Sequence, residues 1–171
     1  MEISIKKVSL SDLEQLQQIS RTTFEETFAS SNSEDNMNQY LNEGFANEKL
    51  ISELSNPSSE FYFAKLQEEI IGYLKINFGD AQTELQNQHS MEIERIYVLS
   101  AFHGKKVGQL LYDFAVQLAK EHLVEYIWLG VWEENHRAIG FYKKNGFVEF
   151  DKHVFMLGDD AQTDIMMRKQ L

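Results

Sequence analysis

The chain has no cysteine, and this absence excludes several kinds of chemistry. Disulfide bonds, thiolate metal sites and a cysteine nucleophile all need a thiol, so none of them can occur here. The five histidines do not have the spacing of zinc ligands. We therefore expect no metal site. The histidines are His89, His103, His122, His136 and His153.

Proline and long apolar segments are also scarce. One proline, nine glycines and 43% hydrophobic residues are typical of a folded chain rather than a low-complexity one. A chain of 171 residues predicts a single domain spanning residues 1–171. The N-terminal MEISIKKVSL has no apolar signal-peptide region, and no run approaches the roughly 18 apolar residues of a membrane span. We expect a cytoplasmic protein with no membrane partner.

Positive charge is in short supply, with 16 lysines and arginines against 27 acidic residues and a net charge of −11. A nucleic-acid-binding protein needs a basic face, so we expect no nucleic-acid partner. The imbalance is greatest between Ser31 and Glu60, where six acids accompany a single base, Lys49. A cationic partner would explain this segment, and so would acidic helix faces that serve solubility. The six acids are Glu34, Asp35, Glu43, Glu48, Glu53 and Glu60.

Apolar periodicity predicts a mixed sheet of six to seven strands flanked by helices, an α/β architecture. Ser11-x-x-Glu14 is a capping box that predicts the start of the first helix. Residues 79–90 (GDAQTELQNQHS) are polar and predict a mobile loop. Strands are predicted at residues 3–8, 61–65, 70–78, 91–98, 126–131, 147–151 and 163–169. Helices are predicted after residue 11, after the capping segment SSNSED (30–35), from about residue 47, from residue 107 and after residue 135.

One segment suggests an anion site. The predicted strand 91–98 leads through a loop with Gly104 and Gly108 into a helix patterned at 3.6-residue spacing from Val107. A helix start offers unpaired backbone N–H groups and the positive end of the helix dipole. This arrangement suits a phosphate or pyrophosphate.

A second segment carries a family resemblance. A predicted strand (126–131) leads to Asn135 and a helix that ends at Asn145-Gly146. This segment resembles the second half of the acetyl-coenzyme A site of GCN5-related N-acetyltransferases, through the pattern Asn135-x-x-Ala138-Ile139-x-Phe141-Tyr142-x-Lys144-x-Gly146-Phe147. The segment around Gly104 and Gly108 resembles the first half. The segments IERIYV, IWLGVWE, AIGFYKKNGF and GDDAQTDIMM are most similar to PaiA-type spermidine/spermine acetyltransferases.

The resemblance covers nearly the whole chain and implies a binding site for acetyl-coenzyme A. Two residues depart from the family pattern, which expects Arg or Gln at His103 and Gly at Lys106. Such changes are tolerated if Lys106 keeps a negative φ, because backbone amides hold the pyrophosphate. Lys144 is expected to meet the 3′-phosphate unless it is simply solvated. The implied cofactor-binding residues are Ile96, Tyr97, Val98, His103, Gly104, Lys105, Lys106, Val107, Gly108, Gln109, Asn135, Ala138 and Lys144.

Three side chains are candidates for catalysis. Strand alternation groups Glu92 and Glu94 on one face with Ile96 and Val98, opposite Ile93, Arg95 and Tyr97. Two carboxylates on one face either pair with bases, reach solvent or act in proton transfer. The resemblance implies that Glu92 is the general base and leaves Glu94 to orient water or the amine. It also implies that Tyr142 is the general acid, against the alternative of a core aromatic.

Together these features predict transfer of an acetyl group to a primary amine by direct attack in a ternary complex. The PaiA likeness and the acidic segment favour a polyamine. Another small amine and a protein or peptide amine remain alternatives, as does a non-catalytic coenzyme A-binding module. Family habit favours a homodimer.

Overall fold

The computed structural model describes residues 2–171 and contains one seven-stranded sheet with helices on both faces. The strand order is β1-β2-β3-β4-β5-β7-β6, and β4 and β5 are parallel neighbours. The strands are β1 (Ile3–Lys7), β2 (Ser59–Leu66), β3 (Glu69–Phe78), β4 (Ser90–Val98), β5 (Tyr126–Trp132), β6 (Val148–Leu157) and β7 (Asp160–Gln170). The helices are α1 (Leu13–Phe28), α2 (Glu34–Gly44), α3 (Asn47–Ser55), α4 (Val107–Glu121) and α5 (His136–Lys144). The predicted fold class is confirmed.

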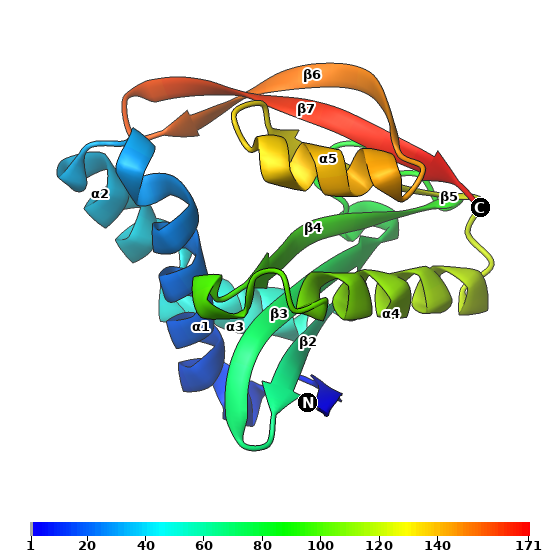
Figure 1. The fold of residues 1–171 in the computed structure, drawn as a ribbon, viewed down its shortest axis with the longest axis horizontal. Coiled ribbons are helices and arrows are strands. Elements are labelled where there is room, and N and C mark those ends of the chain that lie inside the picture. Colours follow the sequence, from blue (N-terminus) through cyan, green and yellow to red (C-terminus); the bar gives the residue numbers. More distant parts are fainter. Residues whose placement is uncertain (1) are drawn as a thin grey trace.

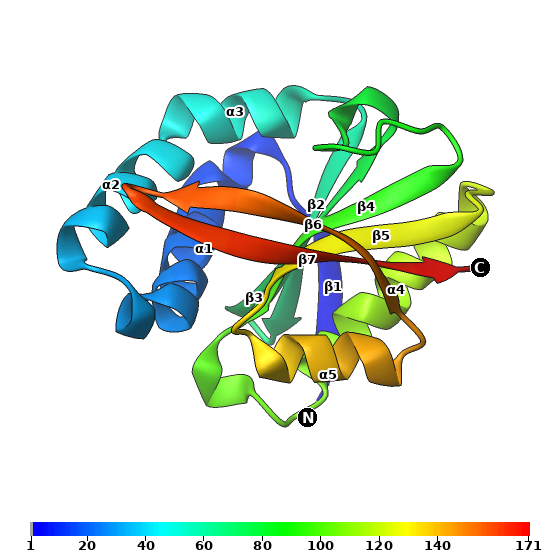
Figure 2. The same ribbon diagram turned by 90° about the horizontal axis from the view of Figure 1, so that it is seen from above.

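The sheet lies between two apolar cores. Helices α1, α2 and α3 cover one face, and α4 and α5 cover the other (Figures 1 and 2). Leu111 of α4 belongs to the same buried cluster as Leu74 of β3. Leu16 and Phe24 of α1 belong to a second cluster with Phe63 of β2. Because each such side chain contributes about 1.5–3 kcal/mol on burial, the two cores hold the sheet firmly between the layers.

Strands β4 and β5 separate part-way along the sheet. Within residues 2–171 they pair over Ser90–Glu92 and Tyr126–Trp128. Strand β4 nevertheless continues to Val98, and β5 continues to Trp132. Backbone N–H and C=O groups of β4 beyond Glu92 therefore lack a ladder partner on the β5 side, and such groups need a partner. The sheet thus contains an internal strand edge that an extended ligand can pair with.

A β-bulge in β4 reverses the predicted side-chain alternation. The register between β3 and β4 shifts at Glu94, which has no partner residue on β3. Ile93 and Ile96 consequently pack against the same core, that of α4, whereas Tyr97 packs against the core of α1. The predicted grouping of Ile93 with Tyr97 is therefore wrong, because an extra residue flips every later side chain. The residues on the face of α1–α3 include Glu92, Arg95 and Tyr97.

Two further local predictions are wrong. Helix α1 follows a 3-10 turn, and the capping box is formed by Ser9 and Asp12 rather than by Ser11 and Glu14. The Asp12 carboxylate accepts the Ser9 N–H at 3.0 Å, which closes the turn ahead of α1. Strands β6 and β7 are longer than predicted, because a two-residue turn with Gly158 at φ 64° lets them pair up to the tip of the hairpin.

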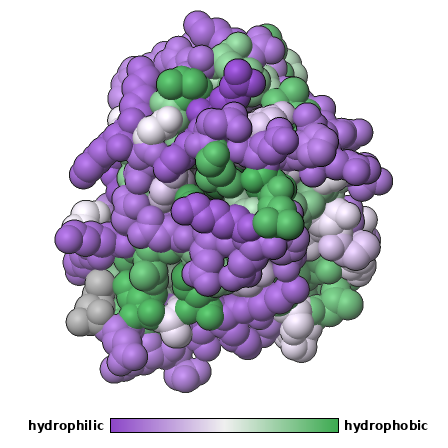
Figure 3. Space-filling view, turned by 90° about the vertical axis from the view of Figure 1, so that its right-hand side faces the viewer, coloured by the Kyte–Doolittle hydropathy of each residue, from purple (hydrophilic) through white to green (hydrophobic). Residues whose placement is uncertain are grey.

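The surface reflects the acidic composition. The end of the molecule that carries the C-terminus is mostly hydrophilic, and its apolar residues gather in small separate patches (Figure 3). Among helices within residues 2–171, none combines the length and the apolar character that crossing a membrane requires. No group of three or more histidine, aspartate or glutamate side chains in this part of the chain has the arrangement of a metal site.

Candidate functional site

The loop between β4 and α4 presents open backbone at the start of the helix. The first intrahelical bond of α4 runs from the Leu110 N–H to the Lys106 carbonyl at 3.1 Å. The N–H groups before Leu110 therefore have no partner inside the helix. A Cβ built on Gly108 meets no heavy atom within 4 Å. Open backbone at the positive end of the helix dipole suits a phosphate or pyrophosphate group.

Lys106 does not keep a negative φ. It is the N-cap of α4 with φ 65°, in the left-handed region, so the condition under which the change from Gly is tolerated without strain is not met. A side chain in this region costs roughly 1–2 kcal/mol, because its Cβ approaches the following carbonyl oxygen. Gly104, at φ 78°, takes a similar conformation without that cost. The loop therefore turns into α4 through two left-handed residues, of which one is strained.

Side chains around this loop contact the rest of the protein. His103 Nε2 lies 2.8 Å from the carbonyl oxygen at the end of β4. Lys105 Nζ lies 5.4 Å from the centre of the Phe102 ring, within the range of a cation–π contact. The carboxylate of Glu26, from α1, accepts the Ser100 backbone N–H at 3.0 Å and the Ser100 hydroxyl at 2.5 Å. These contacts fix the shape of the loop from the protein side.

The second predicted cofactor segment lies beside the first. Gln109 of α4 donates to the Asn145 side chain, just beyond the end of α5, at 3.1 Å. Asn135 caps α5, since its side-chain oxygen accepts the Ala138 N–H at 3.2 Å. Its Nδ2 amide is then the group that could reach a ligand. Lys144 is exposed in the last turn of α5. The two segments are thus joined at the helix ends.

Glu92 is a buried carboxylate, with 3% of its surface exposed. Its Oε1 accepts the Asn77 side-chain amide at 3.0 Å and the Thr83 backbone N–H at 2.8 Å. Its Oε2 accepts the Thr83 hydroxyl at 2.6 Å. Burial raises the pKa of Glu92 and outweighs these hydrogen bonds, which act to lower it. A carboxylate with a raised pKa is suited to accept a proton near neutral pH.

Glu94 has a different environment two residues further on. Its Oε2 lies 2.6 Å from Lys75 Nζ and 3.3 Å from Arg95 Nε, and both bases also pair with Glu53 of α3. Burial alone would raise the pKa of Glu94, but the charges of Arg95 and Lys75 and their hydrogen bonds hold it below its usual value. Glu94 is therefore an ionised carboxylate whose charge Lys75 and Arg95 balance, and it is a poor proton acceptor.

Tyr142 is a buried aromatic residue with an unusual phenol. It packs against the Phe141 and Phe147 rings at centroid distances of 5.4 and 5.5 Å. Burial raises the pKa of Tyr142 above its usual value of 10, so the phenol stays protonated and able to donate. Burial also raises the pKa of Tyr97, and the neighbouring Tyr142 phenol adds to that shift. The two phenols, one from α5 and one from β4, therefore lie in the same region of the site.

The polar sequence of the loop between β3 and β4 predicts a mobile segment, but hydrogen bonds anchor this loop to the sheet. Gln82 is 1% exposed, and its side chain donates to the backbone carbonyls of Gly79 and Asn87. The Gln82 oxygen accepts from the Ser90 hydroxyl at 2.8 Å and from Trp128 Nε1 at 2.7 Å. This anchor brings Thr83 onto Glu92, a contact that sequence analysis missed. No periodic pattern marks a glutamine that is buried by its own loop.

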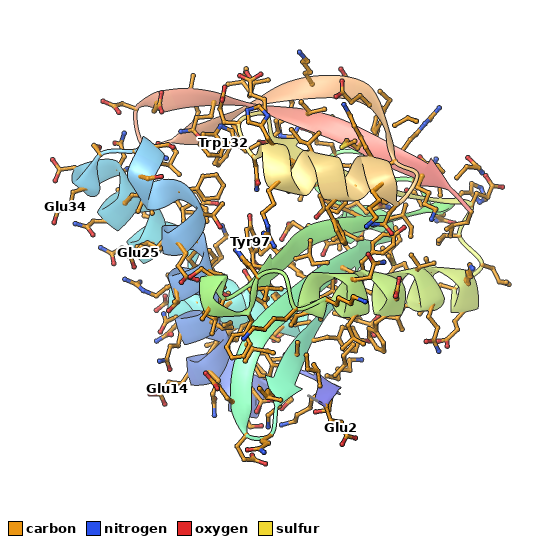
Figure 4. The ribbon with its side chains drawn as sticks, viewed as in Figure 1. Glu2, Glu14, Glu25, Glu34, Tyr97 and Trp132 are labelled. Carbon is orange, nitrogen blue, oxygen red and sulfur yellow. The ribbon has the colours of Figure 1, made fainter. Side chains whose placement is uncertain are left out.

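The acids between Ser31 and Glu60 are not gathered at the site. Glu53 pairs with two bases, and Glu60 pairs with Lys7 at 3.1 Å. Figure 4 shows Glu34 on the outer side of α2, whereas Tyr97 and Trp132 lie in the interior between α1 and the β6–β7 hairpin. The exposed members of the set are Glu34, Asp35, Glu43 and Glu48.

Aromatic side chains line this interior instead. The Phe28 ring of α1 lies 5.2 Å from that of Trp132, at the end of β5. Tyr40 of α2 lies 6.2 Å from Phe155 of β6. Tyr40, Tyr97, Trp132 and Phe155 are partly buried and pack against the α1 core. The face opposite α4 and α5 is thus lined by aromatic side chains beside the buried ion pairs of Glu94.

Other carboxylates do lie on this side of the sheet. His153 of β6 lies between Glu84 (Nδ1 to Oε1, 3.1 Å) and Asp164 (Nε2 to Oδ2, 3.5 Å). A Cβ at Gly130 of β5 would come within 3.5 Å of both His153 and Asp164. An open cavity of about 590 Å³ lies between the start of α2 and the tip of the β6–β7 hairpin. It is lined by Ser30, Ser31, Asn32, Ser33, Asn36, Asp159 and Asp160.

Comparisons with known proteins agree with this geometry. The model of the acetyltransferase (GNAT) family matches residues 13–147. An uncharacterized N-acetyltransferase of Lactobacillus delbrueckii subsp. lactis is 41% identical, over 99% of this chain and 98% of the relative. A spermidine N(1)-acetyltransferase of Thermoplasma acidophilum is 29% identical, over 86% of this chain and 89% of the relative.

The crystal structure of a PaiA N-acetyltransferase from Thermoplasma acidophilum, solved with coenzyme A, has the same fold. It is 27% identical with a TM-score of 0.82, and the match covers 100% of both chains. A GCN5-related N-acetyltransferase structure from Rhodopseudomonas palustris is 19% identical with a TM-score of 0.78, over 100% of this chain and 97% of that one. Because the family model spans well over half of the sequence, the chain belongs to the GNAT family of acetyltransferases.

Proposed function

We propose that this acetyltransferase binds acetyl-coenzyme A in the opening between β4 and β5 and transfers the acetyl group to a primary amine. The observation that carries the proposal is the internal edge of β4, which begins after Glu92 and leads to the open backbone of Gly108. An extended pantetheine can pair with such an edge. The first turn of α4 suits the pyrophosphate. A relative of the same fold was solved with coenzyme A.

The chain's own residues supply the proton transfers. Glu92 has a raised pKa and takes a proton from the incoming ammonium, which leaves a neutral amine able to attack. Bound acetyl-coenzyme A supplies the acetyl group as a thioester. Tyr142 is protonated at neutral pH, as a phenol with a pKa of 10 or more is, and it donates that proton to the departing sulfur. Glu94 takes no part in proton transfer, because Lys75 and Arg95 hold it ionised.

A polyamine is the proposed acceptor. It is supported by 29% identity to a spermidine N(1)-acetyltransferase. The polar cavity with Asp159 and Asp160 offers carboxylates for a second ammonium, on the side of the sheet away from α4. The acidic segment from Ser31 to Glu60 does not support this substrate, because its acids are either exposed on the surface or paired with lysine or arginine side chains.

A peptide or other aromatic-bearing amine is a second candidate, favoured by a specific observation. The interior between α1 and the β6–β7 hairpin is lined by Tyr40, Tyr97, Trp132 and Phe155. Aromatic faces bind ammonium groups and apolar side chains alike. A relative of 27% identity, from Sulfolobus acidocaldarius, is an N-alpha-acetyltransferase.

A panel of amines, assayed for release of free coenzyme A thiol, tests the proposal. The panel contains spermidine, spermine, putrescine, lysine and short peptides with aromatic and with small N-terminal residues. We expect the highest kcat/KM for spermidine or spermine. A higher kcat/KM for an aromatic peptide would select the second candidate, and no thiol release with any amine would contradict the proposed acceptor class.

A further inference from the structure

Glu92 is almost fully buried, and one neighbouring residue supplies two of its three hydrogen-bond donors. Only 3% of Glu92 is exposed, and three donors occupy its carboxylate. Asn77 belongs to the buried sheet, whereas the other two donors, a backbone N–H and a hydroxyl, both belong to Thr83. Because Thr83 is exposed and Glu92 is not, an amine from solvent reaches Thr83 more readily than Glu92. Direct contact between the ammonium and the carboxylate would require Glu92 to become exposed.

Thr83 is itself exposed, and its hydroxyl donates to the buried Glu92 carboxylate. A hydroxyl has one proton to donate and two lone pairs to accept with. The proton of Thr83 is directed at Glu92 Oε2 over 2.6 Å, which leaves its lone pairs for an incoming N–H. We propose that Thr83 relays the proton of the acceptor ammonium to Glu92, an inference that rests on the proposed function.

The step balances without any added reactant. An N–H bond of the ammonium, or of one bridging water, breaks as its proton joins Thr83 Oγ1. The original O–H bond of Thr83 breaks as that proton joins Glu92 Oε2. Thr83 is unchanged, Glu92 becomes a neutral acid, and the amine becomes a neutral nucleophile. The reverse transfer returns the proton to solvent after the product leaves.

The position of Thr83 does not depend on Glu92 alone. The preceding residue, Gln82, is 1% exposed and its side chain takes part in four hydrogen bonds, including one with Trp128 of β5. The Thr83 backbone N–H would still reach Glu92 if the hydroxyl were removed. Replacing the hydroxyl by a methyl group is therefore expected to leave the loop in place.

The charges around this pair influence its titration. Glu94 on the same strand adds to the raised pKa of Glu92. Lys75 of β3 and Arg95 of β4 neutralise Glu94. On the loop, Glu84 follows Thr83 and pairs with His153 of β6, which also faces Asp164 of β7. Glu53 of α3 completes the set by pairing with Lys75 and Arg95.

Thr83→Val and Thr83→Ser separate the relay from a structural role. The valine variant keeps the shape and the backbone bond but has no hydroxyl, whereas serine keeps both. We expect Thr83→Val to lower kcat/KM by about 10²-fold and to flatten the pH limb that depends on Glu92, and Thr83→Ser to restore most of the rate. Thr27→Val is the control, because it removes a hydroxyl that donates within α1 to the Thr23 carbonyl.

A double-mutant cycle with Glu92→Gln gives the decisive result. If Thr83 acts through Glu92, adding Thr83→Val to Glu92→Gln should cost less than about twofold. A full additive loss, or a parent-like pH profile in Thr83→Val at unchanged Tm, would overturn the relay. Thiol release by the parent protein reports on the acetyltransferase proposal separately. The pKa of the Glu92 carboxyl, followed by NMR, should rise in Thr83→Val whether or not the panel holds the right amine.

Discussion

The two sides of the β4–β5 opening are built in different ways. The proposed cofactor side comes from two short strand–loop–helix segments, residues 91–109 and 126–147, each continuous in the sequence. The acceptor side is assembled from α1, α2, the β3–β4 loop and the β6–β7 hairpin. Local segments carry their geometry in neighbouring residues, so a motif can reveal them. A site made of distant segments depends on tertiary packing, so amino-acid composition alone does not predict which side chains line it.

The pair Glu92 and Glu94 offers the sharpest test of this contrast. Glu92→Gln should lower kcat/KM by about 10²–10⁴-fold, because the proton acceptor is lost. Glu94→Gln should instead lower the free energy of unfolding, by about 2 kcal/mol, because Lys75 and Arg95 lose a charged partner. Paired pH–rate profiles and denaturant titrations of the two variants measure both effects.

The effect of Glu94→Gln on stability should depend on pH with a definite sign. The pKa of Glu94 is lowered in the folded protein from its usual 4.5, so its stabilisation is present above that value and is lost as the pH falls through the folded pKa. The difference between parent and variant should therefore shrink in acid. A variant equally destabilised at pH 7 and pH 3 would contradict this account of Glu94.

Tyr142→Phe tests the phenol on the cofactor side, with Tyr97→Phe as its matched control. Tyr142→Phe should lower kcat by about 10²-fold with little change in either KM, because ring packing is kept and one proton donor is lost. Tyr97→Phe removes a nearby phenol from β4 and should have the smaller effect on kcat. Steady-state kinetics that showed equal losses would assign the acid role to neither residue alone.

The acceptor side can be tested through salt. Each partly exposed pair between an ammonium and a carboxylate contributes roughly 0.2–1 kcal/mol, so two such pairs would favour spermidine over a monoamine by several-fold. Screening over about 8 Å at physiological ionic strength should raise the KM for spermidine while kcat holds. Asp159→Asn with Asp160→Asn should remove most of this preference if the cavity holds the second ammonium.

The smallest expected effect concerns the strained residue of the cofactor loop. Lys106→Gly should stabilise the protein by about 1 kcal/mol, because glycine adopts φ 65° without a Cβ clash. The matched change Lys105→Gly, at the neighbouring residue of the same loop, should destabilise slightly, because Lys105 has no positive φ to relieve and glycine loses more backbone entropy on folding. Tm values of the two variants give the comparison, and a lower Tm for Lys106→Gly would show that the left-handed residue is not strained.

The sequence predicts the fold, and the two segments that resemble a cofactor site do lie side by side in it. Apolar spacing marks the strands and helices, and Gly104 and Gly108 mark the turn between β4 and α4. The sequence leaves the sign of φ at Lys106 open, because nothing in a lysine residue reports it. The prediction fails along β4, because the bulge at Glu94 is set by pairing with β3 rather than by the residues of the strand itself.

The acceptor side shows the limit of composition. Six acids between Ser31 and Glu60 suggest a cation site, yet Glu53 is neutralised by bases on strands far along the chain. The contact between Thr83 and Glu92 depends on the buried side chain of Gln82. Because the whole loop is polar, its sequence predicts a mobile segment and gives no sign of this anchor. Each of these features arises from which segments meet in space.

The most direct test is the binding of acetyl-coenzyme A to Gly108→Val, measured by calorimetry. A Cβ at Gly108 meets no protein atom within 4 Å, so valine should fold normally but crowd the backbone against a pyrophosphate. Gln117→Val is the control, because it places the same residue at an exposed position further along α4. We predict parent-like Tm values for both variants and at least tenfold weaker binding only in Gly108→Val. Unchanged affinity in Gly108→Val would contradict the assignment of the opening as the acetyl-coenzyme A site.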